Sequence, residues 1–415
     1  MVRSLRSVND PLGSYLRVTN HDHTFLAQML VEARSIGTGL VADPALSDLH
    51  RDLWNEAHAR GVETVLDPRT LDLSTEGGFL RSGAQALPWA PEKPHRPADL
   101  RGVAGRLLCE RIADMVEAVG HTAVMAPTHL LSDTSPDWLT VDAYLTRELR
   151  AVLNARGLGN VTIYYPLIIK GEQFYDQDWR DAIKTHLKFL PIDAIWLRVH
   201  PFGTPRSGPL VLQRYLAACR DLHSLNLPLV GEHTGSIGVA LMAFGAIGGI
   251  ESGITFVDHT NLTGWIKPAK KSGGGGNEAR VYLQGLGSFL DRSKARELFE
   301  RPGMKAAHGC RDTACCRRGW RDTLVRYREH FVTQRAREAN SMSQMPENLR
   351  PGQYLENFLR PATDAAARAA AVEPSLDRIR KQLDSWRGTL GADLTTHSGF
   401  SFSPPAAGKR LKRTA

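Results

Sequence analysis

Residues 161–202 read VTIYYPLIIKGEQFYDQDWRDAIKTHLKFLPIDAIWLRVHPF, and they hold two apolar runs, at 161–169 and 192–202, separated by a more polar stretch. Each run is rich in Val, Ile, Leu or Tyr and is bounded by turn residues, which is typical of a parallel strand buried on both faces. Short apolar runs alternate with amphipathic stretches in the same way from about residue 22 to residue 300. The other runs stand at 38–44, 62–68, 122–127, 227–233, 248–259 and 279–286.

Eight such strands with intervening helices predict an α/β fold of the (β/α)8 TIM-barrel type. An open doubly wound sheet is the alternative, but no Gly-x-Gly-x-x-Gly motif directly follows the first strand. The length of 415 residues suits a barrel of roughly 250 residues with an appendage. We therefore expect a barrel at 1–300, a Cys/His zinc module with a basic helix at 301–345, further helices at 346–390 and a flexible basic tail at 391–415.

Two long insertions interrupt the strand pattern. Residues 69–98 are rich in Pro and Gly and follow the second run, and residues 260–278 follow the seventh. Loops of this length usually serve as lids or binding loops, or are disordered. In the second insertion, Lys267, Lys270 and Lys271 precede four glycines, which fits a mobile basic flap over an anionic substrate or a plain disordered segment.

The charge balance of the chain is basic, with a formal net charge of +8 and a pI near 9.3. This balance favours a polyanionic partner, DNA or RNA, although a run of arginines is equally typical of a solvated face. The excess gathers near the C-terminus, in the final GKRLKRTA and at Arg311, Arg317, Arg318, Arg321, Arg326, Arg328, Arg335 and Arg337.

Membrane and secretory segments are not expected. The sequence has no run of about 18 apolar residues, which a transmembrane helix would need. Its N-terminal MVRSLRSVNDPLGSYLRV lacks the apolar part of a secretory signal. Cys109 and Cys219 stand alone in helical patterns and are most simply buried thiols. We therefore expect a cytoplasmic protein without a membrane partner.

The segment HGCRDTACCRRGWRDTLVRYREHFVTQRAR (308–337) gathers three of the five cysteines. Three thiolates and the imidazole of a histidine on the following helix form a complete tetrahedral set for zinc, which would be structural because no position stays open. His308 is a rival fourth ligand, and inert or redox-active thiols or a disulfide are the alternatives to a metal. The predicted ligands are Cys310, Cys315, Cys316 and His330.

Catalytic groups of an eightfold barrel lie at the C-terminal ends of its strands. The polar residues at the predicted strand ends include many carboxylates, and two carboxylates across one pocket can cleave a bond at an anomeric carbon as nucleophile and acid/base. Capping of turns and helices is the alternative role of such Asp residues. The candidates are Asp43, Asp67, His129, Lys170, Arg198, His200, Glu232, His233, Glu251 and Asp258.

Two further features lie near these strand ends. After His233, the residues Thr234, Gly235 and Ser236 lead into a short helix of small and apolar residues, whose first backbone N–H groups could hold an anion or a carbonyl. Tight packing of the helix on the barrel explains the same glycines equally well. Arg198 and His200 alternate on the fifth predicted strand; facing the pore, they could bind an anionic group and move a proton.

A barrel with strand-end carboxylates, followed by the cluster of Cys310, Cys315, Cys316 and His330 and by a basic region, resembles the tRNA-guanine transglycosylase superfamily, including paralogues that insert 7-deazaguanines into DNA. The resemblance covers about residues 20–340. It implies that a barrel Asp attacks the anomeric carbon of a guanosine and that a deazaguanine replaces the departing guanine. It also implies a structural zinc that braces the part of the protein gripping nucleic acid.

On this resemblance, Asp258 is expected to be the nucleophile and Asp67 the acid/base, while Glu232 and the turn from Gly235 hold a purine or 7-deazaguanine base. A non-catalytic nucleic-acid-binding subunit of the same superfamily is one alternative. A barrel hydrolase or lyase acting on a small anionic metabolite is another, with the basic C-terminus serving solubility or assembly into an oligomer.

Overall fold

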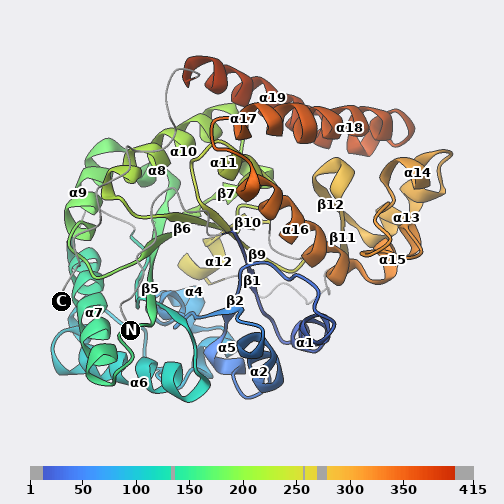
Figure 1. Cartoon of the computed structure of the whole chain (residues 1–415). Helices are drawn as coiled ribbons and strands as arrows, with labels where there is room; N and C mark the ends of the chain where they lie inside the picture. Colours follow the sequence, from blue (N-terminus) through green and yellow to red (C-terminus); the bar gives the residue numbers. More distant parts are fainter. Residues whose placement is uncertain (1–12, 132–135, 256–257, 269–277, 398–415) are drawn as a thin grey trace.

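The computed structural model describes residues 13–131, 136–255, 258–268 and 278–397, so the predicted lysine–glycine flap apart from Lys267 and most of the predicted tail lie outside the described residues. Eight parallel strands close into a barrel in the order β1-β2-β3-β4-β5-β6-β8-β9, which confirms the predicted (β/α)8 fold (Figure 1). The strands are Gly13–Arg17 (β1), Gly39–Ala42 (β2), Glu63–Leu66 (β3), Ala123–Met125 (β4), Thr162–Lys170 (β5), Ala194–His200 (β6), Leu229–Glu232 (β8) and Gly249–Gly253 (β9).

Helices surround the barrel, and the longer ones turn one apolar stripe toward the strands. In α6, for example, Leu108, Ile112 and Val116 follow the helical spacing of four and are all buried. The surrounding helices are His23–Val31 (α1), Arg51–Ala59 (α2), Val103–Val119 (α6), Pro136–Ala155 (α7), Gly171–Phe174 (α8), Gln177–Leu187 (α9), Pro209–Leu222 (α10) and Ile237–Ala243 (α11).

The prediction for the eighth barrel strand was wrong. The run at 279–286 forms Arg280–Leu283 (β11), which pairs antiparallel with Ser288–Asp291 (β12) in a hairpin outside the barrel. The eighth strand of the barrel is β1, which lies between β9 and β2 and precedes the first predicted run. With only the apolar pair Tyr15 and Leu16, β1 is too short to show an apolar run. The barrel therefore closes at Gly253 rather than near residue 300.

The barrel interior explains how the mouth acquires its charges. Tyr15, Val65, Trp196 and Val230 belong to one buried apolar cluster inside the barrel. Side chains of a strand alternate between its two faces, so the residue two places further along points the same way. At the C-terminal ends of the strands these next inward positions are polar, namely Arg17, Asp43, Asp67, Arg198, Glu232 and Glu251.

The two predicted insertions meet over the mouth of the barrel. Residues 69–98 form short helices rather than an open loop, namely Thr70–Ser74 (α3), Glu76–Phe79 (α4), Ser82–Gln85 (α5) and the start of a 3-10 turn, Pro97–Leu100 (η2). In the second insertion, Thr263–Ile266 (α12) packs against α4. The contact is so close that a Cβ on Gly77 would lie 2.2 Å from the carbonyl oxygen of Gly264. Between the two insertions, Phe202–Gly203 (β7) pairs with His259–Thr260 (β10).

The C-terminal region packs on one side of the barrel (Figure 1). Helix α16 contacts β1, α11 and the β11–β12 hairpin. The first residues of the predicted flexible tail, 391–397, belong instead to α19, and the rest of that segment lies outside the described residues. The elements are Arg292–Glu300 (α13), Met304–His308 (α14), Trp320–Val325 (α15), Tyr327–Gln344 (α16), Arg350–Tyr354 (α17), the π-helical turn Leu355–Leu359 (η6), Arg360–Val372 (α18) and Asp377–His397 (α19).

Among the described residues, none of the helices has the length and apolar character to cross a bilayer.

Trp196 tests the contribution of the barrel interior. It is fully buried and its ring lies 4.9 Å from that of Tyr15 and 5.2 Å from that of Tyr164, centroid to centroid. Trp196→Ala should lower the free energy of unfolding by about 3–5 kcal/mol, because it removes apolar contacts and leaves a cavity. Urea unfolding measures this. Leu210→Ala, at an exposed position, is the control; equal effects of both substitutions would contradict the assignment.

Candidate active site at the barrel mouth and metal centre

A cleft of about 540 Å³ opens at the C-terminal ends of the barrel strands. This is the end at which barrel enzymes bind their substrates, and the volume suits a small organic molecule. The cleft is lined both by ionic side chains and by a group of apolar ones. The lining side chains include Arg17, Asp43, Asp67, Arg69, Asp72, Arg198, Glu232, His233, Leu71, Leu262 and Trp265.

Arg17 organises the ionic wall. Its guanidinium contacts three carboxylates, two on β8 and β9 and one directly after β3. The nitrogen–oxygen distances are 2.6 Å to Asp67, 3.5 Å to Glu232 and 3.0 Å to Glu251. Because all three partners are nearly inaccessible to solvent, these charges interact far more strongly than surface pairs do.

A second guanidinium, that of Arg198, shares two of these carboxylates. It lies 2.7 Å from Glu232 and 3.3 Å from Asp67. Burial raises the pKa of Asp67, but the charges of Arg17 and Arg198 lower it by more, so this carboxyl stays ionised. The sequence-predicted Asp67, Arg198 and Glu232 thus come together at one rim of the barrel.

Of these three carboxyl groups, Glu251 is the one that keeps its proton near pH 7. Two guanidiniums cannot neutralise three carboxylates, and Glu251 is the most deeply buried of the three. Burial, reinforced by the neighbouring Glu232, raises the pKa of Glu251 to about 8, although Arg17 opposes part of the shift. Strongly perturbed carboxyls of this kind are typical of acid–base sites.

His233 links Glu251 to the cleft. Its Nδ1 lies 3.1 Å from a carboxylate oxygen of Glu251, and its Nε2 lies 3.6 Å from Glu232. Burial and the charges of Arg17 and Arg198 lower the pKa of His233 well below its ordinary value, so the ring is neutral near pH 7. Its backbone has a φ of 50°, the left-handed region that costs energy for a residue with a Cβ.

Other predicted site residues lie elsewhere. Asp258 is not among the residues lining the cleft; although burial raises its pKa, hydrogen bonds from His259 and Arg280 lower it to about 2. The ring of His200 accepts a hydrogen bond from the backbone N–H of Leu262, so it anchors the second insertion. Gly235 and Ser236 lie in the turn behind His233, and Ser236 lines a separate small cavity rather than the cleft.

The apolar wall comes from the two insertions. Leu71, Leu262 and Trp265 line it, and Leu71 and Leu262 belong to a buried cluster that Trp265 packs against. The indole N–H of Trp265 donates to Asp72, and the Arg81 guanidinium lies 3.5 Å from the centroid of its ring. These contacts fix the indole in place beside the ionic wall.

Two residues of the cleft, Arg17 and Trp265, were not predicted from the sequence. Arg17 was missed because β1 was not recognised, and a charged residue two positions after a buried Tyr was the available signal. Trp265 falls in a predicted loop, and nothing in its sequence neighbourhood indicates that it meets the first insertion. Glu251 appeared among the strand-end candidates but was not assigned a role.

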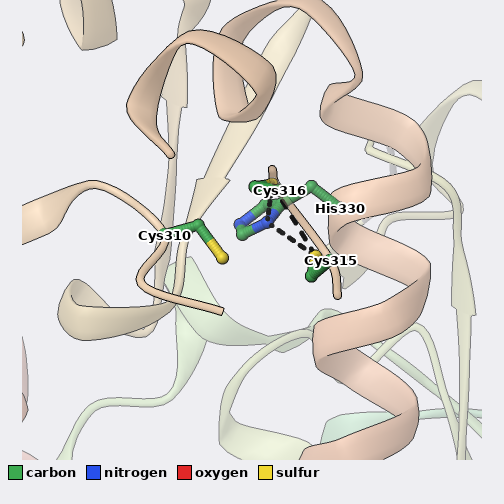
Figure 2. A group of neighbouring side chains, drawn as sticks. All are labelled: Cys310, Cys315, Cys316 and His330. Atoms are coloured by element: carbon green, nitrogen blue, oxygen red, sulfur yellow. Dashed lines mark hydrogen bonds between the residues drawn. The ribbon is translucent and has the colours of Figure 1, made fainter. Parts of the chain in front are cut away.

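The four predicted metal ligands come together between the hairpin and α16 (Figure 2). Their ligand atoms all lie within 4.8 Å of one another. The sulfurs of Cys315 and Cys316 are 3.7 Å apart, and each lies 3.4 Å from Nδ1 of His330. Bond lengths of about 2.3 Å to sulfur and 2.0 Å to nitrogen would place the ligands of a tetrahedral zinc roughly 3.5–3.8 Å apart. The cluster, completed by Cys310, can therefore hold a metal ion.

Glu232, His233 and Glu251 also lie close enough together to hold a metal ion. The guanidiniums of Arg17 and Arg198 already occupy the space beside these carboxylates, at 3.0 Å from Glu251 and 2.7 Å from Glu232. A divalent cation there would be repelled by both. We therefore interpret this group as a proton-handling site rather than a metal site.

No protein-family model and no curated protein matches the sequence. Solved structures that align with it include a putative phosphonomutase from Burkholderia cenocepacia J2315, at 14% identity over 60% of this chain and 88% of that chain, with a TM-score of 0.35. A xylanase from Cellvibrio japonicus aligns at 12% identity over 58% and 86%, with a TM-score of 0.37. Because these similarities are so remote, the fold assignment rests on the strand pairing described above.

Glu251→Gln tests the shared-charge arrangement. Between its ordinary pKa of 4.5 and about 8, the folded protein keeps on Glu251 a proton that the unfolded chain has released. Stability should therefore fall as pH rises through this range, by up to about 1.4 kcal/mol per pH unit. In Glu251→Gln this contribution disappears. Urea unfolding from pH 5 to pH 9 measures the difference, and a difference that does not vary with pH would contradict the assignment.

Proposed function

We propose that this protein is an enzyme that carries out acid–base chemistry of the hydrolase or lyase type in the cleft at the barrel mouth. The observation that supports this most is the sharing of two buried guanidiniums by three carboxylates. This arrangement holds an ionised Asp67, a protonated Glu251 and a neutral His233 side by side. Groups of similar chemistry kept in different protonation states are what general acid–base catalysis requires.

The proposed roles follow from position. Glu232 lines the cleft and has one carboxylate oxygen, Oε2, that is buried and without a hydrogen-bond partner, so it is placed to accept a proton from a bound molecule. Glu251 does not line the cleft, but it contacts His233, which does. A proton could pass from Glu251 through the imidazole to the substrate once these two groups, which approach to 3.1 Å, align as a hydrogen bond. Asp67 stays charged and keeps both arginines in place.

The shape and charge of the cleft indicate the kind of substrate. Apolar and ionic side chains line the same cleft, which suits a molecule with an apolar or planar body and a polar edge. The ionisable residues lining the cleft, His aside, are three arginines and four carboxylates, namely Arg17, Arg69, Arg198, Asp43, Asp67, Asp72 and Glu232. The excess of carboxylates favours a neutral or cationic group at the ionic wall over an anionic metabolite.

Turnover of a small-molecule mixture tests this proposal for any substrate that the mixture contains. The protein is incubated with a metabolite extract, and masses that fall or rise are followed by mass spectrometry. Glu232→Gln should reduce any such turnover by about 10²–10⁴-fold, because it removes the proton acceptor. Glu297→Gln, on the exposed face of α13, is the matched control. Equal turnover by wild type and Glu232→Gln would exclude the assigned role.

Exchange of a guanine-type base in DNA or tRNA is the second candidate function. The Cys/His cluster and the carboxylates Asp67 and Glu232 at one rim favour it, because they correspond to the features that carried the resemblance to transglycosylases. Asp258 could act as nucleophile there only if its carboxylate left Arg280, which lies 2.8 Å away. Exchange of labelled guanine that Asp258→Asn abolishes would favour this candidate. Salt-sensitive binding of nucleic acid without exchange would instead favour a non-catalytic subunit.

We also propose that the cluster of Cys310, Cys315, Cys316 and His330 holds one structural zinc ion. With four protein ligands the metal would have no open position, so its contribution would be to folding, on the order of 10 kcal/mol for small zinc modules. Metal analysis should find about one zinc per chain in the wild type and almost none in Cys315→Ser. Cys219→Ser, a buried thiol outside the cluster, should keep its zinc. Full zinc content in Cys315→Ser would contradict the proposal.

A further inference from the structure

The four residues of the Cys/His cluster differ in their exposure to solvent. Cys315, Cys316 and His330 are 5%, 1% and 2% exposed, whereas Cys310 is only partly buried. In Figure 2, dashed lines join His330 to Cys315 and Cys316 but not to Cys310, which approaches the cluster from another stretch of the chain. Cys310 is therefore the thiol of the cluster that a dissolved molecule reaches most easily.

Cys310 lines a second pocket, of about 610 Å³, beside the cluster. This pocket shares none of its lining residues with the cleft at the barrel mouth. Its lining side chains are mainly polar and include Arg311, Gln334 and Arg337. The pocket thus gives a small hydrophilic molecule a route to the sulfur of Cys310 that does not pass through the proposed active site.

The surroundings of Cys310 favour reaction of its sulfur. The side-chain amide of Gln334 donates to this sulfur at 3.7 Å. Arg311 is held at the pocket by hydrogen bonds from Nε and a terminal nitrogen to a backbone carbonyl of α14, at 3.2 and 2.7 Å, and Arg337 pairs with Asp312. Two guanidiniums against one carboxylate leave an excess of positive charge. Partly exposed cysteines in positive surroundings react with oxidants, whereas buried thiols are inert.

We propose that Cys310 is a site of oxidation by hydrogen peroxide or a small organic hydroperoxide, and that this oxidation releases the metal. In the first step the thiolate sulfur attacks one peroxide oxygen. The S–O bond forms as the O–O bond breaks, and the departing hydroxide takes a proton from solvent, which leaves a sulfenic acid on Cys310. The release of metal rests on the zinc ion proposed above, but the identity of the reacting thiol does not.

The neighbouring thiolates complete the reaction. Because the ligand atoms of the cluster all lie within 4.8 Å of one another, the sulfur of Cys315 or Cys316 can attack the sulfenic acid of Cys310. An S–S bond forms, the S–O bond breaks, and the hydroxide leaves and is protonated to water. Each of the two thiolates loses one electron and the peroxide gains two. The metal then keeps only two of its four ligands, which lowers its affinity.

Loss of the metal would reach the barrel through α16. This helix carries His330 and contacts β1, the strand that ends in Arg17. Because the zinc is proposed to contribute to folding, the oxidised protein should be less stable and, where the reduced protein turns over a substrate, less active. A disulfide is reduced by small thiols, so the change is reversible.

Hydrogen peroxide added to the full-length protein as purified tests which thiol reacts. Differential alkylation with mass spectrometry reports each cysteine, and a chromogenic chelator reports released zinc. Cys310 should be oxidised first and then linked to Cys315 or Cys316 as zinc is released, while the buried Cys109 and Cys219 stay reduced. A reducing thiol with added zinc should reverse both changes. Oxidation of Cys109 or Cys219 before Cys310, or zinc retained after the disulfide has formed, would overturn the inference.

Gly285→Leu tests the pocket as the route of the oxidant. A Cβ on this pocket residue would make only ordinary contacts, at 3.9 Å from the carbonyl oxygen of Ala307 and 4.0 Å from Nδ1 of His308. The added side chain should narrow the pocket and slow the oxidation of Cys310 by about threefold or more, because oxidation follows access, while zinc content stays unchanged.

The matched control is Gly388→Leu, at an exposed position of α19 where a Cβ meets nothing within 4 Å, and its Cys310 should react as in the wild type. Equal rates of oxidation in the wild type and Gly285→Leu would exclude the pocket as the route and overturn the inference. A protein that is purified without zinc, but in which Cys310 still reacts first, would count against the proposed metal alone.

Discussion

The barrel mouth depends on one constraint, which is that two buried guanidiniums must satisfy three buried carboxylates. Arg17 and Arg198 come from β1 and β6, and their partners stand on β8, on β9 and directly after β3. Some of the ion pairs join neighbouring strands, and those to Asp67 join strands that are not neighbours in the barrel. Burying charges is costly unless each is paired, and here one carboxyl must keep its proton. Stability and reactivity of the cleft are therefore set by the same interaction.

The alternation of side chains along strands let much of this be predicted from the sequence. Seven of the eight expected strands lie in the barrel, and of the adjacent pair Tyr164 and Tyr165, the first faces the interior and the second the surrounding helices. Asp67, Arg198 and Glu232 were expected at the strand ends and meet there. The four Cys/His ligands were also expected together, because their chemistry suits a metal irrespective of the surrounding fold.

The features that could not be predicted from the sequence depend on contacts between distant parts of the chain. Strand β1 has too few apolar residues to be recognised, so the group on which the mouth depends, Arg17, had no predicted place. Residues 279–286 have the composition of a buried strand, yet a tight turn begins at Gln284, so the strand before it pairs locally with β12. Asp258 follows β9 in the sequence, but Arg280, which comes later in the chain, holds its carboxylate. Local pattern cannot indicate such partners.

The contact between Gly77 and Gly264 has a consequence for how this protein can diverge. Two insertions that are almost two hundred positions apart in the printed sequence line the cleft together, and they touch where position 77 has no room for a side chain. A lengthened or bulkier segment on either side would push the other away and displace Trp265. New ligand preferences should thus arise through paired changes in both segments, and homologues ought to show these two stretches covarying in length and composition.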